Sequence, residues 1–172
     1  MRTVTFADPK VVDLLNERYV VAWNNHSLDR TAKGPQPVYT PEEMAAYPEG
    51  GGGTNLYTML ADPDGSVLNV LTGFWSASTL LDELEFCRGL TRENRTDRQG
   101  VRQMTLRQEA GKLQKEFPGE MEKRPKDSAV VRRFAALHLL ARCHDQNTFA
   151  TAEGIDEYLA AISERTRARV HV

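Results

Sequence analysis

Residues Thr54–Trp75 of the chain read TNLYTMLADPDGSVLNVLTGFW, and this stretch decides the fold. Two runs rich in strand-forming residues, Asn55–Ala61 and Ser66–Leu71, flank the sequence Asp62-Pro63-Asp64-Gly65. The proline presets the backbone for the first turn position, and the glycine supplies the left-handed conformation that closes the turn. The pattern therefore predicts a β-hairpin.

A glycine-aromatic corner, Gly73-Phe74-Trp75, follows the hairpin, and a helix is expected over Ala77–Arg88 with Gly89 as its C-terminal cap. Its inward face should carry the apolar residues Leu80, Leu81, Leu84 and Cys87. Phe74 and Trp75 form either a core corner or a contact surface, and the sequence does not separate these alternatives.

Upstream of the hairpin, Asp8-Pro9 is typical of a helix start, because Asp can cap the helix and Pro fits its first position. This helix should continue to about Arg18 with one apolar face, formed by Val11, Val12, Leu14 and Leu15. The apolar run Tyr19–Trp23 then predicts a buried strand.

Residues 24–40 are polar and rich in Gly and Pro, which predicts a long loop. Thr40-Pro41-Glu42-Glu43 is a capping box that predicts a short helix to about Tyr47. The run Gly50–Gly53 predicts a flexible entry to the hairpin. It is not a phosphate-binding loop, since a strand rather than a helix follows it and the required lysine is missing.

From Thr91 onward the pattern is helical. One helix should end at Pro118-Gly119, and the next should be capped by Asp127 or Ser128. The apolar face of the second helix is expected to consist of Val130, Phe134, Leu137, His138 and Ala141. A last helix is expected over Ala152–Arg165, so we expect a helical extension at residues 91–172 beside a first domain at residues 1–90.

The 172 residues carry a net charge of −2, which is divided unevenly. Residues 1–90 hold 6 Lys/Arg against 12 Asp/Glu, and residues 91–172 hold 16 against 12, so the halves carry −6 and +4. No apolar run approaches the ~20 residues that span a bilayer, and the N-terminus lacks the layout of a signal peptide. We therefore expect a cytoplasmic protein with no membrane partner. The opposite charges favour docking of the two halves.

The order of these elements resembles the thioredoxin-like superfamily over about residues 3–90. The phrase TFADPKVVDLLNERYV at Thr5–Val20 is similar to one that precedes the second parallel strand in bacterial thioredoxin-domain proteins. A second family pattern, with Pro-Thr, Asp and two glycines, is matched by Gly53-Thr54, Asp62, Gly65 and Gly73. The resemblance implies an α/β fold: an incomplete thioredoxin-like sheet with flanking helices, followed by the α-helical extension.

The chain departs from the family in two ways. The family's first βα unit and its C-x-x-C lie upstream of the phrase at Thr5, where this chain begins, and Gly53 stands in place of the family's cis-proline. No catalytic residue is carried over. The resemblance leaves a candidate groove or contact surface at Gly53, Thr54, Phe74 and Trp75. If the first central strand is missing, either Arg2–Phe6 or a second copy of the chain should cover the open sheet edge.

The remaining chemistry is sparse. Cys87 and Cys143 are 56 residues apart in predicted helices, and two buried, reduced thiols are favoured over a disulfide. Neighbouring side chains on a helix do not face each other, so Cys143 and His144 do not form a nucleophile–base pair. His138 is expected to be a hydrogen-bonded core residue. No metal site and no cofactor are expected.

The densest basic run consists of Arg92, Arg95, Arg98, Arg102 and Arg107. Such a stripe could contact nucleic acid phosphates, but it lacks interleaved aromatic residues and contains Glu93 and Asp97. A solvated helix face is favoured.

Three hypotheses of function follow. The leading one is a redox-inactive thioredoxin-like module that binds a protein partner or a second copy of itself. The second is a thiol-disulfide oxidoreductase truncated before its C-x-x-C, which an in-frame continuation upstream of Met1 would reveal. The third is a basic-helix nucleic-acid binder.

Overall fold

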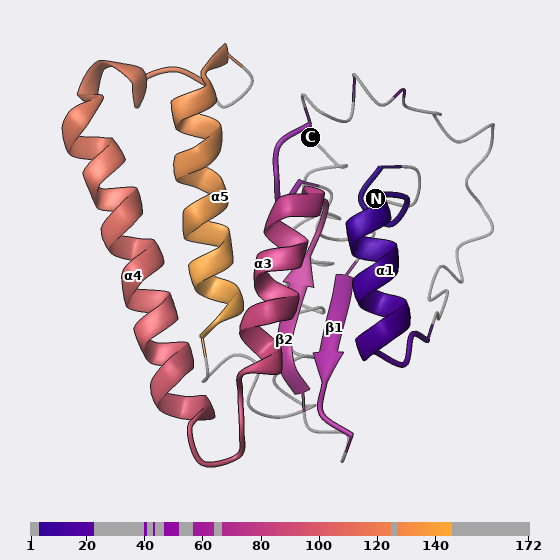
Figure 1. The fold of residues 1–172 in the computed structure, drawn as a ribbon. Coiled ribbons are helices and arrows are strands. Elements are labelled where there is room, and N and C mark those ends of the chain that lie inside the picture. Colours follow the sequence, from indigo (N-terminus) through magenta and orange to yellow (C-terminus); the bar gives the residue numbers. More distant parts are fainter. Residues whose placement is uncertain are drawn as a thin grey trace, which may run out of the picture.

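The computed structural model describes residues 4–22, 40, 43, 47–51, 57–63, 67–124 and 127–145. The elements, in chain order, are α1 (Pro9–Arg18), β1 (Tyr57–Ala61), β2 (Val67–Thr72), α3 (Ala77–Arg88), α4 (Arg95–Glu116), the 3-10 turn η1 (Pro118–Glu120) and α5 (Ala129–Cys143). The protein is thus mixed α/β, as expected (Figure 1). No helix within these residues combines the length and apolar content needed to cross a membrane.

The predicted hairpin is present. β1 and β2 pair antiparallel from Tyr57 opposite Thr72 to Ala61 opposite Val67, with a bulge where the register shifts after Leu60. The ends at residues 55–56 and 64–66 lie outside the described residues. β2 is more buried than β1, since its last four residues, Asn69, Val70, Leu71 and Thr72, are all buried.

The corner after β2 is built from close backbone contacts between glycines. Gly73 has a φ of +86° and Gly50 a φ of +73°, conformations that glycine adopts at low cost. The Gly50 N–H donates to the Phe74 carbonyl at 2.6 Å, and the Phe74 N–H donates to the Gly51 carbonyl at 2.8 Å. The first two glycines of the run are therefore fixed to the corner, contrary to the expected flexible entry.

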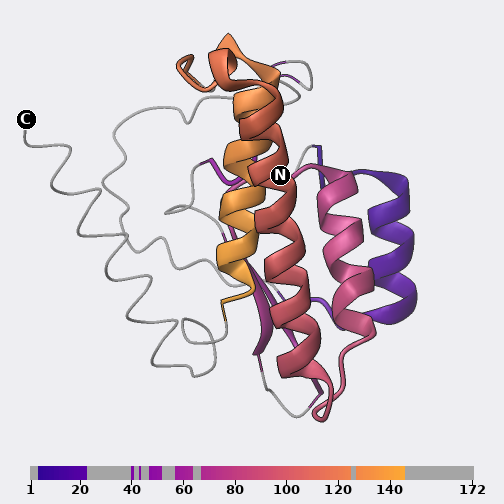
Figure 2. The same cartoon turned by 90° about the vertical axis from the view of Figure 1, so that its left-hand side faces the viewer.

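α1 and α3 lie side by side over one face of the hairpin (Figures 1 and 2). α1 is capped by the Asp8 carboxylate, which accepts from the N–H groups of Lys10 and Val11. α3 is capped by Ser76 and ends at Gly89, as predicted. The Tyr19 hydroxyl donates to the Leu84 carbonyl at 2.7 Å, which joins the end of α1 to α3.

The strand predicted over Tyr19–Trp23 is wrong for the four residues that can be assessed. Residues 19–22 have no regular structure, and Val20 is fully exposed. Pairing of Arg2–Phe6 into the sheet was one of two alternatives for the open edge, and the described residues of this segment, 4–6, instead form a turn in which the Thr5 hydroxyl donates to the Trp75 carbonyl at 2.5 Å. A strand forms only where a neighbouring strand can pair with its backbone N–H and C=O groups. Residues 4–6 and 19–22 do not pair with each other in this way.

The capping box at Thr40 is confirmed: the Thr40 N–H donates to the Glu43 carboxylate at 2.8 Å, and the Glu43 N–H donates to the Thr40 hydroxyl at 3.2 Å. The extent of the helix that it begins lies outside the described residues. The same holds for Trp23, Gly53, Thr54 and the helix predicted over Ala152–Arg165.

α4 and α5 form an antiparallel pair that stands beside β2 (Figures 1 and 2). α4 ends before Pro118, and the Ser128 hydroxyl caps α5, as predicted. The buried face of α5 differs in part from the expected one and consists of Val131, Ala136, Leu137, Leu140, Ala141 and Cys143.

One hydrophobic core joins both halves of the chain. It contains Trp75, Leu80 and Leu84 from the first half, together with Leu106, Ala110 and Leu137 from the second. The expected docking of the C-terminal helices onto the first ninety residues is therefore present in the structure.

Candidate functional site

Neither cysteine is positioned for thiol chemistry. Cys87 and Cys143 are free and buried, which confirms the prediction of two unpaired thiols. Burial raises the pKa of each thiol from 9.0 to about 12, and the negative charge of Glu83 adds to both shifts. Because the thiolate is the reactive form, both groups are inert at neutral pH.

The corner aromatics belong to the core. Phe74 is 6% exposed and Trp75 is inaccessible, and the Trp75 indole N–H donates to the Thr72 carbonyl at 3.0 Å. The Phe74 ring packs edge-on against Tyr47, with centroids 5.8 Å apart. Of the two alternatives for this pair, the structure thus favours the core corner over a contact surface.

The most unusual group of side chains surrounds Glu83 on α3, which is 0% exposed. Its Oε1 accepts from Arg102 Nη2 on α4 at 2.7 Å. Its Oε2 accepts from His144 Nε2, at the end of α5, at 2.7 Å and from Asn69 Nδ2 on β2 at 3.0 Å. One buried carboxylate therefore links α3, α4, α5 and β2. We call these four residues the Glu83 cluster.

Hydrogen bonds and charges within the cluster stabilise the negative charge of the buried Glu83 carboxylate. Burial alone would raise the pKa of Glu83, but the hydrogen bonds and positive charges of His144 and Arg102 outweigh it and hold the pKa below the ordinary value of 4.5. An ionised carboxylate only accepts hydrogen bonds, so His144 Nε2 is the donor. His144 Nδ1 is buried without a hydrogen-bond partner in the described residues.

Sequence reasoning overlooked this cluster. Glu83 lies three residues after Leu80 and four before Cys87, on the buried face of α3. A carboxylate inside an apolar face is the signal that could have identified it, because buried charges are almost always paired.

The histidine assignment is also corrected. His138 is exposed and packs edge-on against the Phe134 ring at 4.5 Å, whereas His144 is 2% exposed. The cause is the turn of α5: positions 136, 137, 140 and 141 face the core, and position 138 points to the opposite side.

The arginines of the basic run form the expected solvated face only in part. Arg95 donates to the Val67 carbonyl at 3.4 Å, and Arg98 donates to the Gly89 carbonyl. With Arg102 bound to Glu83, three of the five arginines attach α4 to its neighbours. Arg92, Arg98 and Arg107 are exposed.

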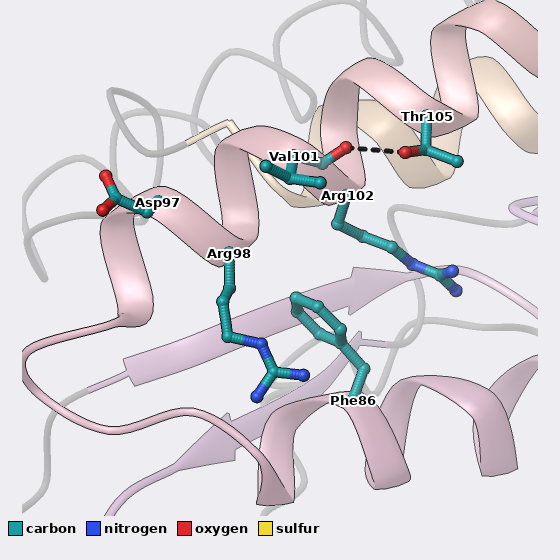
Figure 3. Close-up of a pocket in the computed structure, with 6 residues that line it drawn as sticks. All are labelled: Phe86, Asp97, Arg98, Val101, Arg102 and Thr105. Atoms are coloured by element: carbon teal, nitrogen blue, oxygen red, sulfur yellow. Dashed lines mark hydrogen bonds between the residues drawn. The ribbon is translucent and has the colours of Figure 1, made fainter.

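A pocket of about 310 Å³ lies between α3 and α4, lined by Phe86, Asp97, Arg98, Val101, Arg102 and Thr105 (Figure 3). The Arg98 and Arg102 guanidinium groups lie on either side of the Phe86 ring, each 5.6 Å from its centre. The Asp97 carboxylate points away from the ring. On another side, Phe86 packs edge-on against His144, with ring centroids 5.0 Å apart, and Arg102 belongs to both the pocket and the Glu83 cluster.

No three His, Cys, Asp or Glu side chains in the described part of the chain are grouped to hold a metal ion. Comparison of the chain with models of protein families, with curated proteins and with solved structures found no match.

Proposed function

We propose that the protein is a redox-inactive, thioredoxin-like module that binds a protein partner in the cytoplasm. The observation that carries this proposal is the burial of both thiols, since each is sealed in the core with its pKa raised to about 12. Unpaired thiols are also typical of a reducing compartment.

The arrangement of the N-terminal part supports the thioredoxin-like component of the proposal. An antiparallel hairpin, a glycine with positive φ and a closing helix follow one another over residues 57–88. α1 and α3 cover the same face of that hairpin (Figure 1). Residues 19–22 differ from a thioredoxin-like arrangement, because the family has a parallel strand at this point and these residues form none.

Glu83 and His144 could in principle act as an acid–base pair, but their position in the core supports a structural role for them. Glu83 and His144 are both inaccessible, and a substrate could not reach either side chain without opening the core. The α3/α4 pocket is a concave surface that a ligand could reach without opening the core.

The nucleic-acid hypothesis has less support. Arg95, Arg98 and Arg102 each donate to a group of the protein itself, and the charge of Arg102 is matched by Glu83, so the run presents less unpaired positive charge than its sequence suggests. Salt-sensitive binding to single-stranded DNA that disappears when Arg92 and Arg107 are replaced would favour it over the proposal.

Reduction of insulin disulfides by the purified chain, with dithiothreitol as the electron source, tests the proposal. We expect no rate above that of dithiothreitol alone. A rate that depends on the chain and is lost in Cys87→Ser or Cys143→Ser would overturn it, and would favour the oxidoreductase hypothesis. The two variants are matched, because each removes one buried thiol.

A further inference from the structure

The α3/α4 pocket has the chemistry of a site for an acidic peptide. Its floor is the Phe86 ring, and Val101, which is 57% exposed, forms part of its wall. Met104, 54% exposed, lies one turn further along α4 and extends the apolar surface. Exposed apolar side chains beside a concave site are typical of contact surfaces.

The charges that face this pocket do not cancel. The positive charge of Arg102 is matched by Glu83, with which it forms an ion pair at 2.7 Å. Arg98 forms no ion pair with a carboxylate of the described residues, and its guanidinium donates to a backbone carbonyl. Asp97 is on the rim, but its carboxylate points away (Figure 3). One positive charge therefore remains over an aromatic floor.

We propose that this pocket binds an acidic amphipathic segment of a partner protein, with one apolar side chain against Phe86 and Val101 and an adjacent carboxylate on Arg98. The inference rests on the proposed function as a binding module and names the chemistry of its partner. A guanidinium presents a planar set of donors that fits a carboxylate, and an amphipathic helix presents apolar and acidic groups at the spacing of one turn.

The probe is a fluorescein-labelled peptide in which Leu and Glu recur at helical spacing, and the matched peptide carries Lys in place of every Glu. Fluorescence anisotropy with the full chain should show binding of the acidic peptide and at least about tenfold weaker binding of the basic one, equivalent to about 1.4 kcal/mol. Added salt should weaken the binding of the acidic peptide.

Two variants locate the site. Arg98→Glu should weaken binding of the acidic peptide by about tenfold or more and improve binding of the basic peptide, because it reverses the charge beside Phe86. Val101→Asp should weaken binding of the acidic peptide without disturbing the core, since the Val101 side chain is largely exposed. Arg107→Glu is the matched control: it makes the same charge change on the opposite side of α4 and should leave binding unchanged.

Equal binding of the two peptides, no binding of either, or an effect of Arg107→Glu as large as that of Arg98→Glu would overturn the proposal. Concentration-dependent dimerisation that Val101→Asp abolishes would instead assign the surface to a second copy of the chain. These outcomes are separate from the insulin assay, so the peptide site can fail while the redox-inactive assignment stands.

Discussion

Removal of the buried carboxylate in Glu83→Leu should destabilise the protein strongly. The substitution removes both carboxylate oxygens and takes away the acceptor of two buried donors, His144 Nε2 and Asn69 Nδ2. Each unsatisfied donor costs about 1–3 kcal/mol. Arg102 is 29% exposed and can turn to water, so it adds less.

The two donors together give about 2–6 kcal/mol, and removal of one partner from a buried ion pair gives a similar ~3–5 kcal/mol. We expect a loss of about 4 kcal/mol in the free energy of unfolding, measured by urea denaturation. For a chain of this length that loss corresponds to a Tm lower by roughly 8–16 °C. Glu83→Gln should lose less, because its carbonyl oxygen can still accept from both buried donors.

Glu85→Leu is the matched control, because the same substitution on the same helix breaks only the exposed ion pair with Arg88. It should cost no more than about 1 kcal/mol. If Glu83→Leu and Glu85→Leu were equally stable, the cluster would not hold the elements together. The double variant Glu83→Leu/His144→Leu should recover part of the loss, since it also removes one of the orphaned donors.

Three further predictions concern acid stability, the glycine corner and the junction of the two halves. The pKa of Glu83 is held below 4.5 in the folded state, so the stabilisation that its ionised carboxylate contributes is complete above pH 4.5 and is lost as the pH falls through the folded-state pKa. Urea titrations should therefore show that acidification lowers the free energy of unfolding less for Glu83→Gln than for the parent chain. Gly73→Ala should lower the free energy of unfolding by at least about 1–3 kcal/mol, because its Cβ would lie 2.5 Å from the Gly50 carbonyl oxygen at a φ of +86°. Gly100→Ala, in the exposed interior of α4 with nothing within 4 Å, should raise it by about 0.5–1 kcal/mol, and the opposite order of these two variants would contradict the account. Limited proteolysis should spare Leu90–Asn94, and release of two stable pieces there would mean that the halves do not share a core.

Local chemistry made much of the fold readable from the sequence. Asp8, Ser76 and Ser128 each cap a helix, and Asp8 and Ser128 were among the candidate caps read from the sequence, since a cap depends only on residues within one turn. The hairpin was predicted for the same reason. The strand at Tyr19–Trp23 was not, because a strand depends on a partner that is distant in the sequence.

The candidate site depends on such distant contacts throughout. The four residues of the Glu83 cluster come from four different elements. The spacing of residues within one segment therefore does not predict that Asn69, Glu83, Arg102 and His144 are in contact. Arg95 and Arg102 of α4, which were expected on a solvated face, are half-buried for a related reason. Their long side chains reach neighbouring elements from positions that resemble a solvated helix face in the sequence.

The central claim is that the folded chain seals both of its thiols, and site-resolved alkylation tests it most directly. Native protein is treated with iodoacetamide at pH 8, and the label on Cys87 and on Cys143 is followed by mass spectrometry, with urea-unfolded protein as the reference for full accessibility. Both thiols have a pKa of about 12 and are buried, so neither should be labelled while the protein stays folded. Labelling of either cysteine in the native protein at a rate comparable to that of the unfolded chain would contradict the account.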